Sequence, residues 1–154
     1  MIHSKRTIVL GVAILLIVSL VLLASEAFNP IGKLPGAPAV IISKSTCNRP
    51  PGFVLIIADL SGFNDSVDHG APLHPWPVIH VQRGETVHFV VCNHDETQPH
   101  GFAIRYYLDA GVAMAPNDAY QIVFQATEAG IFDIYCNIFC TIHVFMRGQL
   151  IVSA

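Results

Sequence analysis

The chain reads GIFDIYCNIFCTIHVFM from Gly130 to Met146, and in this stretch a strand pattern runs directly into a cluster of metal ligands. The strand predicted at residues 130–135 ends at Cys136, so the ligands that follow lie on a loop held by a rigid element. Two thiols, one imidazole and one thioether occur between Cys136 and Met146. Such soft donors select copper over magnesium or calcium, and a weak methionine ligand is typical of copper sites that transfer electrons.

A further ligand must come from elsewhere in the chain, and His100 is the best candidate because it opens a predicted strand after the polar turn 93–98. Zinc fits less well, since structural zinc sites use four Cys or His ligands and Met146 would have no role. The remaining histidines that follow the first strand are expected to be surface or hydrogen-bonded side chains without metal: His69, His74, His80, His88 and His94.

The rest of the outer part of the chain alternates short apolar runs with turn residues. Strands are predicted at 53–59, 77–82, 86–92, 101–106, 120–125, 130–135 and 148–152. No convincing amphipathic helix interrupts them, so the pattern predicts an all-β sandwich. The intervening loop 61–76 is long and polar, which is common for loops with a function.

Composition limits the chain to one small domain with an appendage. It has 154 residues, a net charge of -3 and 12% charged residues, without a basic cluster that would bind nucleic acid. Residues 1–27 are predicted to be a cytoplasmic N-terminus followed by a transmembrane anchor, residues 28–52 a Pro-rich tether, and residues 53–154 the folded domain.

The anchor prediction rests on the apolar run from Ile8 to Ala24, preceded by Lys5 and Arg6. A helix over 7–27 is about long enough to cross a hydrocarbon core of ~30 Å. The positive-inside rule places the N-terminus in the cytoplasm and the domain on the extracytoplasmic side of the cell membrane. A cleaved signal peptide is the alternative, because small residues follow the run, and it would place the domain on the same side.

The segment 78–152 resembles subunit II of haem-copper terminal oxidases, most closely the B-family type with one N-terminal transmembrane helix. The matching motifs are His-Gly-Phe at 100–102, Gly-Ile-Phe at 130–132, the cysteine-rich loop, and the closing apolar strand from Gly148. The resemblance implies a cupredoxin-like Greek-key β-sandwich that carries a binuclear copper site, called CuA. Its metal ligands would be His100, Cys136, Ile138 through its main-chain carbonyl, Cys140, His143 and Met146, with the two thiolates as bridges.

One departure leaves the number of copper ions open. Two residues separate Cys140 from His143, whereas the CuA loop has three. The spacing from Cys140 to Met146 is that of a mononuclear blue-copper loop similar to amicyanin. Both kinds of protein place their first cysteine six residues after the turn glycine, which is Gly130 here, so Cys136 is the expected thiolate ligand and Cys140 the additional one.

The resemblance implies a subunit that passes electrons from a cytochrome, blue-copper protein or quinol to catalytic subunit I and converts no substrate itself. One alternative is a free-standing, membrane-tethered mononuclear cupredoxin. Another is a copper-free structural subunit II of a quinol oxidase, which the retained ligand types argue against.

Three further residues carry open expectations. Cys47 and Cys92 form either a disulfide that ties the tether to the sandwich or a pair of free thiols. A disulfide within the copper loop is disfavoured, because it would leave its histidine and methionine unexplained. Trp76, the only tryptophan, is either a packing residue or, by analogy with the family, a point of electron input near the copper.

Overall fold

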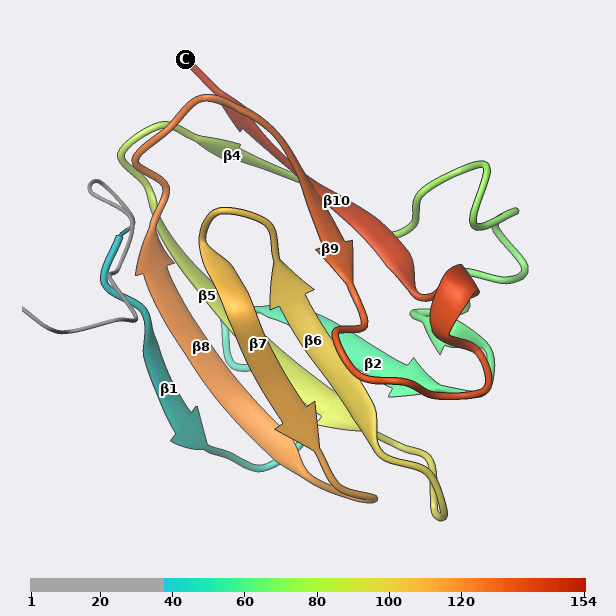
Figure 1. Ribbon diagram of the computed structural model, residues 1–154. Coiled ribbons are helices and arrows are strands. Elements are labelled where there is room, and N and C mark those ends of the chain that lie inside the picture. The colour runs from blue at the N-terminus through green and yellow to red at the C-terminus, as the bar shows by residue number, and fades with distance from the viewer. Residues whose placement is uncertain (1–37) are drawn as a thin grey trace, which may run out of the picture. The chain divides into compact units, whose positions relative to one another are not determined.

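Two five-stranded β-sheets pack face to face in the computed structural model, which describes residues 38–154 (Figure 1). One sheet has the order β1-β8-β5-β2-β3 and the other β4-β10-β9-β6-β7. The strands are β1 (Ile41–Lys44), β2 (Val54–Asp59), β3 (Gly62–Phe63), β4 (Val78–Gln82), β5 (Thr86–Asn93), β6 (His100–Ile104), β7 (Leu108–Met114), β8 (Ala119–Gln125), β9 (Gly130–Tyr135) and β10 (Arg147–Ser153). A short 3-10 helix, η1 (His143–Phe145), precedes the last strand. The predicted all-β sandwich is confirmed.

Alternating burial explains why these residues form strands. In β10 the residues from Arg147 to Ser153 alternate between exposed or half-buried and buried side chains, as a strand with one face on a core requires. The strand lies between β9, which is antiparallel to it, and β4, which is parallel. In the other sheet β5 is central between β2 and β8.

Aromatic side chains fill the space between the sheets. Phe102 on β6 lies between Phe89 and Phe63, with ring centroids 5.7 and 5.8 Å apart respectively. Phe89 in turn stacks on Phe124 of β8. Burial of each such ring stabilises the fold by about 1.5–3 kcal/mol. Because Phe102 follows His100 by two residues, this core also fixes the position of a predicted ligand.

Three strands were not expected from the sequence. β1 lies within the predicted tether 28–52 and pairs with β8; its four side chains are all exposed, so it has no alternating pattern to recognise. β7 contains Gly111 at φ +65° and two exposed residues in succession, which breaks its alternation. β3 is only two residues long. Edge or very short strands carry a weak hydrophobic signal because one partner suffices to hold them.

The segment that follows β1 is joined to the sandwich by a disulfide between Cys47 and Cys92, whose Cα atoms are 5.6 Å apart. Of the two alternatives expected for this pair, the structure has the bonded one. The described residues 38–154 belong to one compact unit.

The predicted membrane segment 7–27 lies outside the described residues. Among residues 38–154, no helix is long and apolar enough to cross a bilayer.

Candidate metal centre

The predicted ligands meet at one end of the sandwich. The loop that leaves β9 at Cys136 passes over the start of β6, where His100 lies, and then enters η1 and β10 (Figure 1). Two neighbouring strands of one sheet, β6 and β9, therefore position His100 and Cys136, which are far apart in the sequence. Sequence proximity could not bring them together; the pairing of β6 with β9 does.

Three sulfur atoms form the centre of the cluster. The Sγ atoms of Cys136 and Cys140 are 3.6 Å apart, and the Sδ atom of Met146 is 3.7 Å from Sγ of Cys140. Donor atoms of Cys136, Cys140 and His143 all lie within 4.8 Å of one another. Both cysteines are free thiols, and both are buried together with Met146.

Hydrogen bonds fix the shape of the loop. The carbonyl oxygen of Ile138 accepts hydrogen bonds from the Cys136 thiol at 3.2 Å and from Nδ1 of His143 at 2.8 Å. This carbonyl oxygen therefore faces the cluster. The backbone N–H of Gly101 donates to Sγ of Cys136 at 3.2 Å. A side chain at Gly101 would place a Cβ 2.8 Å from the backbone nitrogen of Asn137, so only glycine allows β6 and the loop to approach this closely.

His100 is completely buried, and an acidic residue orients it. Its Nε2 atom is 3.3 Å from Oδ2 of Asp95, whereas Nδ1 has no hydrogen-bond partner among the described residues. An unpaired buried nitrogen is unfavourable unless a ligand completes it. Histidines that bind metals commonly donate their other N–H to a carboxylate, which fixes the ring. Asp95 was missed at the sequence level, although it is an acid five residues before a candidate ligand.

The two thiols of the site have different pKa values. Burial alone would raise the pKa of Cys136, but the neighbouring His100 and the N–H of Gly101 outweigh it and lower that pKa below its usual range. Burial and the nearby Cys136 raise the pKa of Cys140. Hydrogen bonds from the backbone and side chain of Thr97 and from the Gln98 backbone lower the pKa of Asp95 to about 2, against the effect of burial. Cys136 is therefore the thiol that ionises more readily, as a metal ligand must.

This donor set suits copper. Two thiols, two imidazoles and a thioether are soft and borderline ligands, and the predicted site residues His100, Cys136, Ile138, Cys140, His143 and Met146 all lie around one point at the end of the sandwich. The Nδ1 atom of His100, unpaired within the described residues, is the orphaned polar atom that a bound ion would satisfy.

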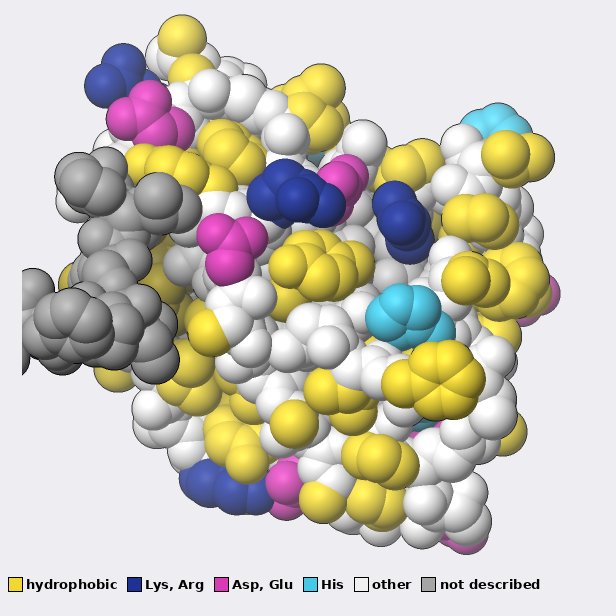
Figure 2. Space-filling view, in the orientation of Figure 1, with side chains coloured by type: hydrophobic (Ala, Val, Ile, Leu, Met, Phe, Trp, Pro, Cys, Tyr) yellow, Lys and Arg dark blue, Asp and Glu magenta, His cyan; other side chains and the backbone are white. Residues whose placement is uncertain are grey.

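A surface hollow of about 160 Å³ opens beside the cluster. It is lined by Arg105, Asp133, Tyr135, Cys136, His143, Val144 and Arg147. Figure 2 shows a histidine, basic side chains and apolar side chains close together on one face. Trp76 lies near the start of β10, since its backbone N–H donates to the carbonyl of Arg147 at 2.8 Å. Its indole N–H bonds to the carbonyl of Asn64, and its ring stacks on His69, so its observed contacts are those of a loop anchor.

A two-sheet sandwich with this donor set at one end defines a cupredoxin. In agreement, the fold is similar to that of reduced auracyanin from Roseiflexus castenholzii, with a TM-score of 0.51, 15% identity, and coverage of 69% of this chain and 100% of that one. No protein-family model matches the chain.

Two curated proteins give a closer relationship. Amicyanin from Paracoccus denitrificans is 30% identical over 123 residues, which cover 77% of this chain and 86% of that protein. Amicyanin from Paracoccus versutus is 40% identical over 82 residues, half of this chain and 55% of that protein's length. The chain belongs to the amicyanin family. These relatives favour the free-standing cupredoxin over the oxidase subunit II that the loop resembles.

Proposed function

We propose that this protein is a free-standing electron carrier with one copper ion, held by His100, Cys136, His143 and Met146. The observation that carries the proposal is the convergence of these donors from two strands onto one buried point, on a scaffold shared with the amicyanins. Copper bound there would supply reversible transfer of single electrons.

The protein's own residues keep the site rigid. Asp95 fixes the ring of His100, the Ile138 carbonyl fixes the ring of His143, and the Gly101 N–H holds the sulfur of Cys136. Ligands held by such neighbours move little when the charge of the site changes, which favours fast electron transfer. His143 and Cys136 both line the surface hollow, and because only Cys136 is fully buried, His143 is the ligand more accessible to a redox partner.

A binuclear centre is the second candidate, and one observation favours it. Sγ of Cys140 lies 3.6 Å from Sγ of Cys136 and points into the same site, where a carrier of a single copper ion needs only one thiolate. The main-chain carbonyl of Ile138 also faces the site, as the CuA resemblance requires. Both thiols would then bridge two copper ions despite the shortened loop.

Two measurements decide between these sites. We expect the copper-loaded protein to contain one copper per chain, with the hyperfine pattern of a single copper nucleus in electron paramagnetic resonance. We expect Cys136→Ser to abolish the thiolate-to-copper absorption and Cys140→Ser to preserve it. Two coppers per chain, with an unpaired electron shared equally between them and lost in both variants, would establish the binuclear centre and refute the mononuclear proposal.

The location and the partners complete the proposal. A helix over 7–27 would anchor the domain on the outer face of the cell membrane, where it would exchange electrons with membrane or soluble redox proteins. We expect the protein to remain with the membrane fraction after a high-salt wash and to be released by detergent. Its purification from the membrane in a fixed ratio with a haem-containing catalytic subunit would instead support the oxidase-subunit alternative.

A further inference from the structure

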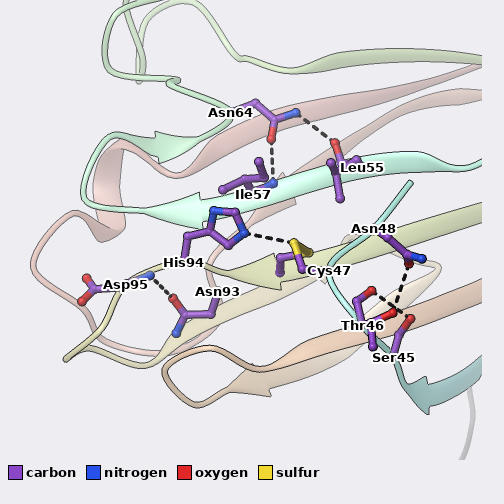
Figure 3. Close-up of a disulfide and its surroundings, with 11 residues drawn as sticks. Ser45, Thr46, Cys47, Asn48, Leu55, Ile57, Asn64, Asn93, His94 and Asp95 are labelled. Carbon is purple, nitrogen blue, oxygen red and sulfur yellow. Dashed lines mark hydrogen bonds between the residues drawn. A yellow bond between two sulfur atoms is a disulfide. The ribbon is translucent and has the colours of Figure 1, made fainter. Parts of the chain in front are cut away.

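A second cluster of metal-binding donor types lies around the disulfide. Donor atoms of Cys47, Cys92 and His94 are all within 4.8 Å of one another. Figure 3 shows the imidazole of His94 pointing at the sulfur of Cys47, and the two atoms are 3.0 Å apart. None of these residues belongs to the copper loop. Two sulfurs and one imidazole are the donors of many Cys-His metal sites.

We propose that reduction of the Cys47–Cys92 disulfide creates a second metal site, made of the two cysteine thiolates and Nε2 of His94. Its ligand is a thiophilic d¹⁰ cation, Zn(II) or Cu(I), because thiolate and imidazole donors select such ions over magnesium or calcium. In the bonded state the sulfurs cannot act as thiolate ligands, so the disulfide keeps the site closed. The proposal does not depend on the copper site.

The three donors stay in place when the sulfur–sulfur bond opens, because each is held by separate backbone contacts. Cys92 belongs to β5, which pairs with β2 and β8 on its two sides. The backbone N–H of His94 donates to the carbonyl of Ala58 at 2.9 Å. Cys47 follows Ser45, whose N–H donates to the carbonyl of Ala119 at 3.0 Å directly after the paired strand β1. A site with pre-positioned ligands binds its ion more tightly.

Exposure determines how the disulfide is opened. Cys47 is exposed and Cys92 is completely buried, so a thiolate of an external protein dithiol attacks Sγ of Cys47. The sulfur–sulfur bond breaks, Cys92 leaves as a thiolate and takes up a proton, and a mixed disulfide forms on Cys47. The second thiol of the reductant displaces Cys47, which also takes up a proton, and the reductant becomes a disulfide after giving two electrons. Binding of the cation then releases both thiol protons.

Acidic side chains near His94 favour the binding of a cation. His94 lines an open hollow together with three acidic side chains, Asp59, Asp95 and Glu96. Their negative potential raises the local concentration of positive ions. The carboxylate of Asp95 points to His100. The backbone N–H of Asp95 donates to the side chain of Asn93 (Figure 3), so the segment that carries His94 is held in place.

The test uses the full chain in detergent, with Cys136→Ser and Cys140→Ser to remove the thiols of the copper loop. Co(II) serves as the probe because it occupies zinc-type thiolate sites and reports them by a sulfur-to-cobalt absorption band. We expect the dithiol-reduced protein to bind one Co(II) per chain with this band, and the disulfide form to show no band. His94→Ala should weaken binding at least about tenfold, and the matched control His80→Ala, an exposed histidine on β4, should leave it unchanged.

Three results would overturn the proposal. The first is a reduced, folded protein without the thiolate band. The second is equal Co(II) affinity of the His94→Ala and His80→Ala variants. The third is loss of the β-sheet circular dichroism signal on reduction, since the site needs the folded arrangement of β1 and β5.

Discussion

Gly101→Ala tests whether the close approach of β6 to the copper loop holds the ligands in place. The added Cβ would lie 2.8 Å from the backbone nitrogen of Asn137 and 3.0 Å from that of Ile138. Both atoms belong to the main chain of the loop, so the clash is relieved only when the loop moves away from β6. That movement also lengthens the 3.2 Å hydrogen bond from Gly101 N–H to the sulfur of Cys136.

The size of the effect follows from where the strain falls. Overpacking by one methyl group costs about 1–3 kcal/mol. The metal-free loop can release that strain by moving away from β6 at the expense of one hydrogen bond, whereas the metal-bound loop must also keep its ligands together. The free-energy cost of the added methyl group therefore falls mainly on the copper-bound protein, and copper affinity should decrease about 5- to 150-fold.

The assay is a competition titration with a copper chelator on the full chain in detergent, followed by the thiolate-to-copper absorption. Gly84→Ala is the control: its φ of +89° makes a side chain strained, but a Cβ there meets nothing within 4 Å and the residue lies in the β4–β5 turn. It should lower thermal stability and leave copper affinity unchanged. A folded Gly101→Ala protein with wild-type affinity and spectrum would refute the argument.

Three further changes have expected outcomes. Asp95→Asn should lower the free energy of unfolding of the metal-free protein by about 1–2 kcal/mol at pH 7 in chemical denaturation. Hydrogen bonds from the backbone that follows Asp95 hold its pKa at about 2, below its ordinary 3.8. The stability that the Asp95 carboxylate contributes is therefore complete above pH 3.8 and disappears as the pH falls towards 2. An unchanged difference in unfolding free energy between variant and wild type at pH 2 would contradict this. Tyr107→Phe removes the hydroxyl that donates to the carbonyl of Glu128 at 2.8 Å and accepts from its N–H at 3.1 Å, so it should cost about 1–2 kcal/mol in the same assay, and no measurable loss would argue against these bonds. Replacing Cys47 and Cys92 together by serine opens a loop with a sequence separation of 45 and should lower stability by about 2–4 kcal/mol, whereas equal midpoints for variant and oxidised wild type would show that the crosslink is not stabilising.

The sequence was sufficient to predict most of the strands that carry a buried face; the exceptions are β7, whose alternation is broken, and the two-residue β3. The predicted strand 130–135 coincides with β9, and those at 53–59 and 86–92 differ from β2 and β5 by one residue at an end. Such strands alternate or are continuously apolar, and that pattern is local. β1 has no such pattern, because it pairs with β8 alone and buries none of its side chains.

The same distinction, between a local sequence pattern and a contact made only in the fold, applies to the metal site. Cys136, Cys140, His143 and Met146 are close in sequence, so their spacing alone indicated a metal loop. His100 required a family resemblance, and Asp95 was not recognised, since its role depends on a contact across a turn that no spacing rule describes. The choice between one and two coppers depends on a loop one residue shorter than that of CuA.

The position of β10, an interior strand of its sheet, has a consequence for the order of assembly. This strand follows the metal loop in the chain, yet it lies between β4 and β9 and completes the sheet to which β6 also belongs. A nascent chain that has emerged only as far as Met146 contains β6 and β9, which position His100 and Cys136, but the strand that anchors the Met146 end of the loop between β4 and β9 has not yet formed. Metal binding in the mature geometry therefore comes only after the last strand has been synthesised and has folded into its sheet.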